Sequence, residues 1–357
     1  MTQTPVSGET PLWRTGFQPR RWLTNRHLQT LAGNYLRREH HLPPPESRLF
    51  KVDDQSLVRC ECHWQLDENN EPRRERMTVI LVHGLEGSAS SHYILGNGTK
   101  MWAAGMNVIR MNMRNCGGTE RLTPTLYHSG LSGDVAAIVN TLIGEGCRAI
   151  ACVGYSMGGN LVLKYAGEVG ADAPRQVKAF IGVSPAADLS ASSTALDHGI
   201  NRLYQWHFLE RMKARFRRKK KLFPEVYAEE NLSPLHSIRA YDEHIVAKYC
   251  GFEGAEDYYY RAAAARVVDR ITVPTLVVHA QDDPFIVLTP ETRAQIVANK
   301  HIELIEPKHG GHCAFLAERG EFSDSYWAER VVRAFLMAHS NYTATMSEDA
   351  ASVVAGN

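Results

Sequence analysis

Residues 148–164 read Arg-Ala-Ile-Ala-Cys-Val-Gly-Tyr-Ser-Met-Gly-Gly-Asn-Leu-Val-Leu-Lys. The apolar run over 148–154 predicts a buried strand, and the residues after the Gly-x-Ser-x-Gly turn have the spacing of an amphipathic helix. A serine between such a strand and helix lies on a tight turn that exposes its hydroxyl. Gly154 and Gly158 flank Ser156 at points where side chains would collide with the neighbouring strand and helix. The stretch therefore predicts that Ser156 is a nucleophile.

A serine hydroxyl is a weak nucleophile, so it needs a base beside it and an acid that orients the base. In folds that use this turn, the acid precedes the histidine along the chain. A buried-strand run over 271–280 is followed by Gln-Asp-Asp-Pro, and a short strand over 301–306 leads into Pro-Lys-His-Gly-Gly-His. We therefore predict Ser156 as the nucleophile, Asp283 as the orienting acid and His312 as the general base.

Each of these assignments has a competitor. Asp282 is an alternative acid, but Asp283 has the better spacing from the strand; Asp188 follows a different strand. His309 competes with His312, but it precedes the glycine pair instead of following it. The plainer interpretation is that Asp-Asp-Pro only forms a turn and that both histidines lie on a surface loop.

Two backbone amides are expected to stabilise the oxyanion, one after the nucleophile and one from an earlier strand-to-helix loop. Residues 77–83 form a buried-strand run, followed by Gly-Leu-Glu-Gly. The predicted donors are the N–H groups of Leu85 and Met157. His83 lies in the wrong loop for a base, so we expect it to be structural.

Several short motifs follow one another along the whole chain. They are Asn25-Arg-His-Leu-Gln-Thr30, His83-Gly-Leu-Glu-Gly87, Arg114-Asn-Cys-Gly-Gly118, Tyr127-His-Ser-Gly130, Gly154-Tyr-Ser-Met-Gly158, Asp282-Asp-Pro284 and Gly311-His312. Together they resemble the YheT-type α/β-hydrolases, a family similar to the ABHD-type lipid esterases and to ester synthases with the same triad. The resemblance runs from about residue 15 to residue 339. It departs from the family at Cys313-Ala-Phe315, where a glycine before the phenylalanine is more usual.

The resemblance implies carboxylic ester chemistry on acyl chains through an acyl-enzyme on Ser156. Water as the acceptor gives an esterase or lipase, whereas an alcohol as the acceptor gives an acyltransferase or ester synthase. A third hypothesis is a non-catalytic binding protein on a hydrolase fold. No metal or organic cofactor is expected, because the chain supplies every reacting group.

Composition favours a single cytoplasmic enzyme. The chain has 357 residues, 44% of them hydrophobic, and a formal net charge of +1, which argues against a polyanionic partner such as nucleic acid. Its seven cysteines are odd in number and lack paired spacing, so they indicate reduced thiols inside a cell. Cys60-Glu-Cys62-His63 has no partner cluster that would make it a metal site. The sequence shows no membrane span and no secretion signal.

The order of strands and helices predicts an α/β fold with a mostly parallel central sheet and helices on both faces. Two antiparallel strands are expected over 46–65 and six buried strands at 77–83, 106–112, 148–154, 177–184, 272–279 and 301–306. Helices are expected at 97–104, 131–143, 157–168, 289–299 and 323–339. The predicted organisation is an N-terminal arm packing on the core (1–45), the first part of the core (46–189), a helical cap insertion (190–268), the second part of the core (269–340) and a disordered tail (341–357).

The cap insertion has an apolar helix face and a basic run. Leu203, Trp206 and Leu209 recur at helical spacing, which indicates either packing on the core or a substrate-binding acyl pocket. Eight of the eleven residues from Arg211 to Lys221 are basic. Such a run is typical of a solvated face, and it also suits peripheral contact with an anionic membrane. No recognition module accompanies it that would indicate nucleic acid.

Overall fold

The computed structural model describes residues 11–36, 38–320 and 324–340. Its eight strands form one sheet in the order β1-β2-β4-β3-β5-β6-β7-β8. Only β2 runs antiparallel to its neighbours, β1 and β4, and the other pairs are parallel. The bounds are β1 Glu46–Lys51, β2 Leu57–His63, β3 Thr78–Val82, β4 Asn107–Met111, β5 Ile150–Tyr155, β6 Val177–Val183, β7 Thr275–Val278 and β8 Ile302–Ile305. The predicted α/β fold is confirmed.

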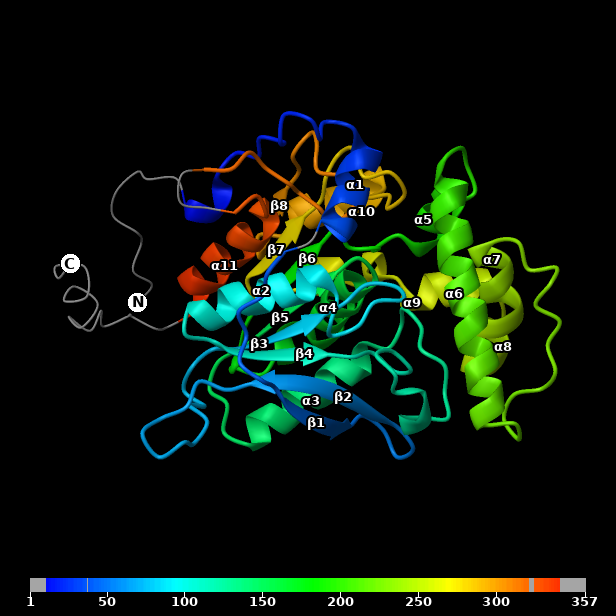
Figure 1. The fold of residues 1–357 in the computed structure, drawn as a ribbon, viewed down its shortest axis with the longest axis horizontal. Helices are drawn as coiled ribbons and strands as arrows, with labels where there is room; N and C mark the ends of the chain where they lie inside the picture. The colour runs from blue at the N-terminus through cyan, green and yellow to red at the C-terminus, as the bar shows by residue number, and fades with distance from the viewer. Residues whose placement is uncertain (1–10, 37, 321–323, 341–357) are drawn as a thin grey trace.

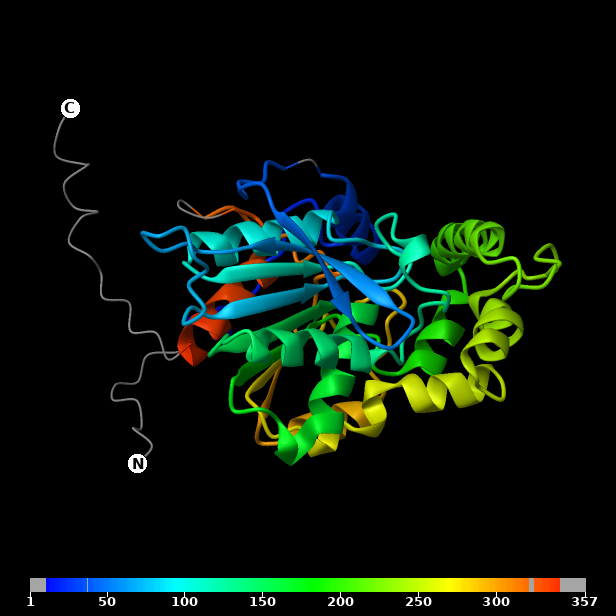
Figure 2. The ribbon, with the colours of Figure 1, turned by 90° about the horizontal axis from the view of Figure 1, so that it is seen from below.

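Two helix layers cover the sheet, and each buries its own apolar cluster. One cluster joins the sheet to α2 (His92–Ala103) and α11 (Trp327–His339). The other joins it to α3 (Ser132–Gly144), α4 (Met157–Val169) and α10 (Pro290–Ala298). A strand that is covered on both faces consists mostly of consecutive apolar residues. β3, with the sequence Thr78-Val-Ile-Leu-Val82, is an example, and its five residues are all buried. Figure 2 shows the sheet between these layers.

The predicted starts of two helices are wrong by several residues. The helix expected at 97–104 begins at His92, and the one expected at 323–339 begins at Trp327. Neither Ser91 nor Tyr326, the residues before these two helices, forms a side-chain capping hydrogen bond, and hydrophobic spacing alone does not fix where a helix begins.

A helical segment between β6 and β7 occupies the position of the predicted cap insertion. It comprises α5 (Leu189–Leu196), α6 (Asn201–Leu222), α7 (Ile238–Tyr241), a π-helical turn (Asp242–Ala247), α8 (Lys248–Cys250), α9 (Ala255–Ala262) and the 3₁₀ turns Ala264–Arg266 and Val268–Arg270. These helices bury a third apolar cluster. Figure 1 shows that they lie beyond the ends at which the parallel strands point. Because ligands bind at that edge of such sheets, the segment lies over the expected site.

The N-terminal arm packs against α11 through two aromatic side chains. The ring of Trp13 meets Phe335 at 5.6 Å, and that of Phe17 meets Trp327 at 5.2 Å. Trp22, however, is 81% exposed, and two leucines of α1 (Arg26–Tyr35), Leu28 and Leu31, are exposed as well. α1 therefore turns one of its faces to solvent. The predicted tail over 341–357 lies outside the described residues.

Candidate active site

Ser156 occupies a strained turn between β5 and α4. Its φ of 54° is in the left-handed region, which non-glycine residues seldom adopt. A Cβ on Gly154 would overlap the carbonyl of Gly158, and one on Gly158 would overlap the carbonyls of Val82 and His83. The two glycines therefore let the turn close against the sheet, and the serine side chain projects from its edge.

The structure brings the three predicted residues together from three loops. His312 Nε2 lies 2.9 Å from Ser156 Oγ, and His312 Nδ1 lies 2.8 Å from Asp283 Oδ2. The second oxygen of Asp283 accepts the backbone N–H groups of Phe285 (3.2 Å) and Ile286 (2.9 Å). The carboxylate is thus held in place, and it orients the imidazole so that Nε2 faces the serine.

The competing residues have other partners. Asp282 lies 3.4 Å from His309 Nδ1 and accepts the backbone N–H of Gly311 at 3.0 Å, so it supports the loop before His312. Asp188 accepts the Thr289 amide and the Thr292 hydroxyl. None of these groups contacts Ser156 or His312.

The electrostatics of the pair favour a charged carboxylate beside a basic imidazole. Burial raises the pKa of Asp283, but the adjacent His312 lowers it by a larger amount. The net pKa therefore lies below the ordinary value. Burial lowers the pKa of His312, whereas its contacts with Cys313 and Asp283 raise it, and the net pKa lies above 6.5. The imidazole is therefore well suited to hold a proton taken from the serine.

We expect the acid limb of the kcat/KM profile to lie above pH 6.5. A base must be neutral to accept a proton, so activity should rise as His312 loses its own proton, and its raised pKa moves that rise to higher pH. In Asp283→Asn the stabilising negative charge is gone, so the limb should shift to lower pH while the maximum rate falls. Initial rates between pH 5 and 10 measure this, and an unshifted limb in the variant would contradict it.

The predicted oxyanion donors are the amide of Met157, which follows Ser156, and the amide of Leu85, which lies in the loop after β3. A Cβ built on Gly84 would lie 3.0 Å from the Ser156 Cβ, so the loop after β3 passes directly beside the serine. Within the described part of the chain, neither the Leu85 nor the Met157 amide donates a hydrogen bond. His83 is fully buried and accepts the Met113 amide at its Nε2, with a pKa lowered to about 4 by burial. It has the structural role expected of it.

An ion pair that the sequence did not reveal joins this loop to the cap insertion. Glu86 is buried, and its carboxylate accepts Arg215 Nε (3.0 Å), Arg215 Nη2 (2.8 Å) and the Tyr127 hydroxyl (2.5 Å). Arg211 Nη2 also donates to the Glu86 carbonyl at 2.8 Å. Four hydrogen bonds thus hold Glu86, the residue after Leu85, against α6 and against the loop that carries Tyr127.

Helix α1 supports the loop that carries His312. The Thr30 hydroxyl accepts the His312 amide at 2.9 Å, and the Gln29 side chain accepts the Leu316 amide at 3.1 Å. Gln29 and Thr30 are almost fully buried. The Asn-x-His-Leu-Gln-Thr element, seen in the sequence only as a resemblance, thus has a physical role close to the site.

Replacing Thr30 with valine is expected to lower kcat/KM by roughly 10-fold to 100-fold. The shape is kept, but the His312 amide loses its acceptor, and small displacements of a base cost that much. Thr30→Ser, which keeps the hydroxyl, should retain most of the activity. Steady-state kinetics with thermal unfolding as a folding control measures this; equal activity in Thr30→Val and wild type would contradict it.

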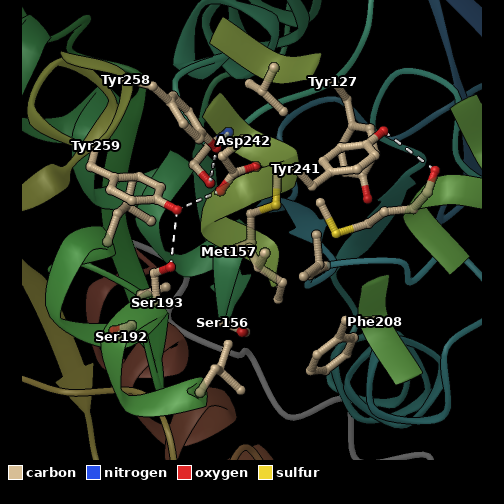
Figure 3. Close-up of a pocket in the computed structure, with 18 of the residues that line it drawn as sticks. Tyr127, Ser156, Met157, Ser192, Ser193, Phe208, Tyr241, Asp242, Tyr258 and Tyr259 are labelled. Atoms are coloured by element: carbon tan, nitrogen blue, oxygen red, sulfur yellow. Dashed lines mark hydrogen bonds between the residues drawn. The ribbon is translucent and has the colours of Figure 1, made fainter. Parts of the chain in front are cut away.

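Two hollows meet at Ser156 and His312. The inner cavity lies beside Ser156 and Met157 and is lined mostly by buried side chains of α5 to α9. The outer groove lies beside His312 and is lined by α1, the loop after β3 and the start of α6. Figure 3 shows Ser156 at the edge of the inner cavity.

The three predicted substrate-binding residues all belong to α6, but they do not lie on the same face of it. Leu203 and Trp206 are 66% and 65% exposed and line the outer groove. Leu209 lines neither hollow, because it is buried in the apolar cluster of the cap insertion. Of the two interpretations, packing therefore describes Leu209, whereas substrate contact by Leu203 and Trp206 stays a prediction. On α6 it is Phe208, Met212 and Phe216 that face the inner cavity.

The basic run from Arg211 to Lys221 is not a continuous solvated face. Arg215 and Lys219 are buried, and the Lys219 ammonium donates to the carbonyls of Glu120 and Thr123. Burial lowers the pKa of Lys219 to about 8. Other members of the run pair with glutamates. The cations available to a membrane are therefore fewer than the sequence suggests.

Two further sequence expectations concern metals and membranes. In residues 11–36, 38–320 and 324–340, no three His, Cys, Asp or Glu side chains are grouped so that they could hold a metal ion. Cys60 and Cys62 are buried in β2. Among the helices of the same ranges, none is both long and apolar enough to cross a membrane.

Comparisons with known proteins agree with this architecture. Residues 78–318 match the family described as the alpha/beta hydrolase fold. YheT of Escherichia coli (strain K12), which carries the name of an esterase, is 33% identical over 84% of this chain and 87% of its own. Phospholipase ABHD3 of Mus musculus is 26% identical over 92% of this chain and 80% of its own.

A solved structure supports the fold independently. The esterase Pf2001 of Pyrococcus furiosus is 16% identical and has a TM-score of 0.51, with 90% of this chain and 100% of that chain covered. The chain therefore belongs to the α/β-hydrolase fold family, in its YheT and ABHD-like branch.

Proposed function

We propose that the protein is a serine hydrolase that cleaves carboxylic esters of acyl chains. The observation that carries the proposal is the continuous hydrogen-bond chain from Ser156 Oγ through His312 to Asp283. Ser156 attacks the ester carbonyl while His312 takes its proton, and the amides of Leu85 and Met157 receive the negative charge on the carbonyl oxygen. His312 then protonates the leaving alcohol, and an acyl-enzyme remains.

The second half of the reaction releases the acyl group. His312 removes a proton from water, the hydroxide oxygen attacks the acyl-enzyme, and Ser156 leaves with the proton that His312 returns. The apolar lining of the inner cavity supports an aliphatic substrate chain. The names of relatives, a phospholipase and a monoacylglycerol lipase, support an ester or lipid substrate.

The proposal is tested with p-nitrophenyl esters from acetate to palmitate and with a serine-directed fluorophosphonate. We expect hydrolysis that peaks at one chain length, and a single adduct on the peptide that contains Ser156. Folded protein that neither hydrolyses any ester nor forms the adduct would refute the proposal and favour a binding protein. Added ethanol separates the acceptors, since ethyl ester formation in preference to free acid would indicate the ester synthase alternative. Membrane contact through the basic run stays a prediction.

A further inference from the structure

The inner cavity is lined mainly by apolar and aromatic side chains, and it also contains a carboxyl group. Asp242 begins the π-helical turn, is 5% exposed and lines the cavity. Its Oδ2 accepts the Tyr259 hydroxyl at 2.7 Å, and that hydroxyl lies 3.0 Å from Ser193 Oγ. Figure 3 shows Ser156 and Asp242 well apart among the side chains drawn, with Met157 between them.

One oxygen of this carboxyl is left without a partner. Within the described residues, Oδ1 of Asp242 forms no hydrogen bond and is not fully enclosed, and no ion pair compensates the group. Arg239, a nearby cation, is engaged by Glu256, and Arg215 is engaged by Glu86. Burial raises the pKa of Asp242 to about 7. The free oxygen of this buried carboxyl can therefore form a hydrogen bond with a polar group of a ligand in the cavity.

The chemistry of Asp242 favours a hydroxyl as that ligand. A hydroxyl donates to an ionised carboxylate and accepts from a protonated carboxyl, so it matches both states near neutral pH. An ammonium group matches only the ionised state, and its burial costs more. The apolar members of the lining include Met157, Leu189 and Ile238. The fitting molecule is therefore an aliphatic chain with a hydroxyl group remote from its ester bond.

We propose that Asp242 is a specificity-determining residue that binds a hydroxyl group carried by the aliphatic chain of the substrate ester. The substrate class is then a hydroxyacyl ester or a monoester of a long-chain diol. This inference rests on the proposed function, because it concerns the same cavity and the same reaction.

The test compares matched esters with and without the terminal hydroxyl. One arm uses p-nitrophenyl octanoate and 8-hydroxyoctanoate, and the other uses octyl acetate and 8-hydroxyoctyl acetate, so the arms tell an acyl hydroxyl from an alcohol hydroxyl. We expect wild type to prefer the hydroxylated ester of one arm by about tenfold or more in kcat/KM. Because both members of a pair are measured on one preparation, the ratio does not depend on the folded fraction.

Three variants make the result specific. Asp242→Leu should reverse the preference, because an apolar side chain leaves the substrate hydroxyl without a partner, and Asp242→Asn should retain part of it. Asp257→Leu, on the same helical segment but outside the cavity lining, should keep the wild-type ratio. A ratio near one in wild type, or one that Asp242→Leu does not change, would overturn the inference while Ser156-dependent hydrolysis left the proposed function standing. Hydrolysis that persists in Ser156→Ala would overturn both.

Discussion

Ser156→Ala is expected to lower kcat for p-nitrophenyl esters by roughly 10⁵-fold to 10⁶-fold, the loss typical of a nucleophile removed from such a triad. The attacking oxygen is gone, whereas His312 and the Leu85 and Met157 amides remain, so only a small residual rate over water should persist. Burst and steady-state kinetics on purified variant and wild type measure the loss. Unfolding curves should coincide, because the serine side chain is small and only half-buried.

Companion variants show whether the three side chains act as one unit. His312→Ala should cost about as much as Ser156→Ala, and the double variant should cost little more, because neither residue works without the other. Asp283→Asn should lose about 10⁴-fold through the wrong imidazole tautomer. The matched controls Asp282→Asn and His309→Ala remove the pair that lies beside the triad and should retain much more activity. A loss in these controls equal to that in the triad variants would refute the assignment.

Arg215→Met is expected to lower the free energy of unfolding by about 3–5 kcal/mol, the usual cost of removing one member of a buried ion pair. Glu86 would keep its Tyr127 contact and the exposed Arg211, whose Nε lies 3.8 Å from Oε2, but would lose both Arg215 hydrogen bonds while it stays buried. Because Glu86 adjoins the candidate oxyanion donor Leu85, kcat should fall as well. Urea unfolding gives the stability, and ester hydrolysis gives the rate.

The control for this variant lies two residues along the same helix. Arg217 is exposed, so Arg217→Met should change the unfolding free energy by no more than about 0.5 kcal/mol. The double variant Glu86→Leu/Arg215→Met should recover part of the loss, because no buried charge is then left unpaired. A wild-type urea midpoint in Arg215→Met would show that the pair does not hold the loop to the cap insertion.

Local patterns were sufficient for the sheet and for the members of the triad. Each core strand is a short apolar run, and the parallel crossovers place the ends of the strands at one edge. Ser156, Asp283 and His312 each follow such a run, so their meeting could be expected without coordinates. The choice of Asp283 over Asp282 also rested on spacing, and the structure pairs Asp283 with His312.

Contacts between distant segments could not be predicted in this way. Thr30 and His312 are 282 residues apart, and Glu86 and Arg215 are 129 apart. In the basic run of α6, each added residue turns the side chain by about 100°, so neighbours alternate between solvent and the protein. Helical spacing likewise placed Leu209 on an apolar face but did not show what that face contacts. In the structure, Leu209 packs in the buried cluster of the cap insertion.

The α/β sheet, the tight serine turn and the order of the acid and the base could be predicted from local sequence, because hydrophobic periodicity and glycine positions act over a few residues. The contact of α1 with the histidine loop, the pairing of Arg215 with Glu86 and the place of Asp242 in the inner cavity were visible only in the folded chain. Those contacts depend on which faces of separate helices pack together. Packing of that kind follows from the shape of the whole folded chain and not from any single segment.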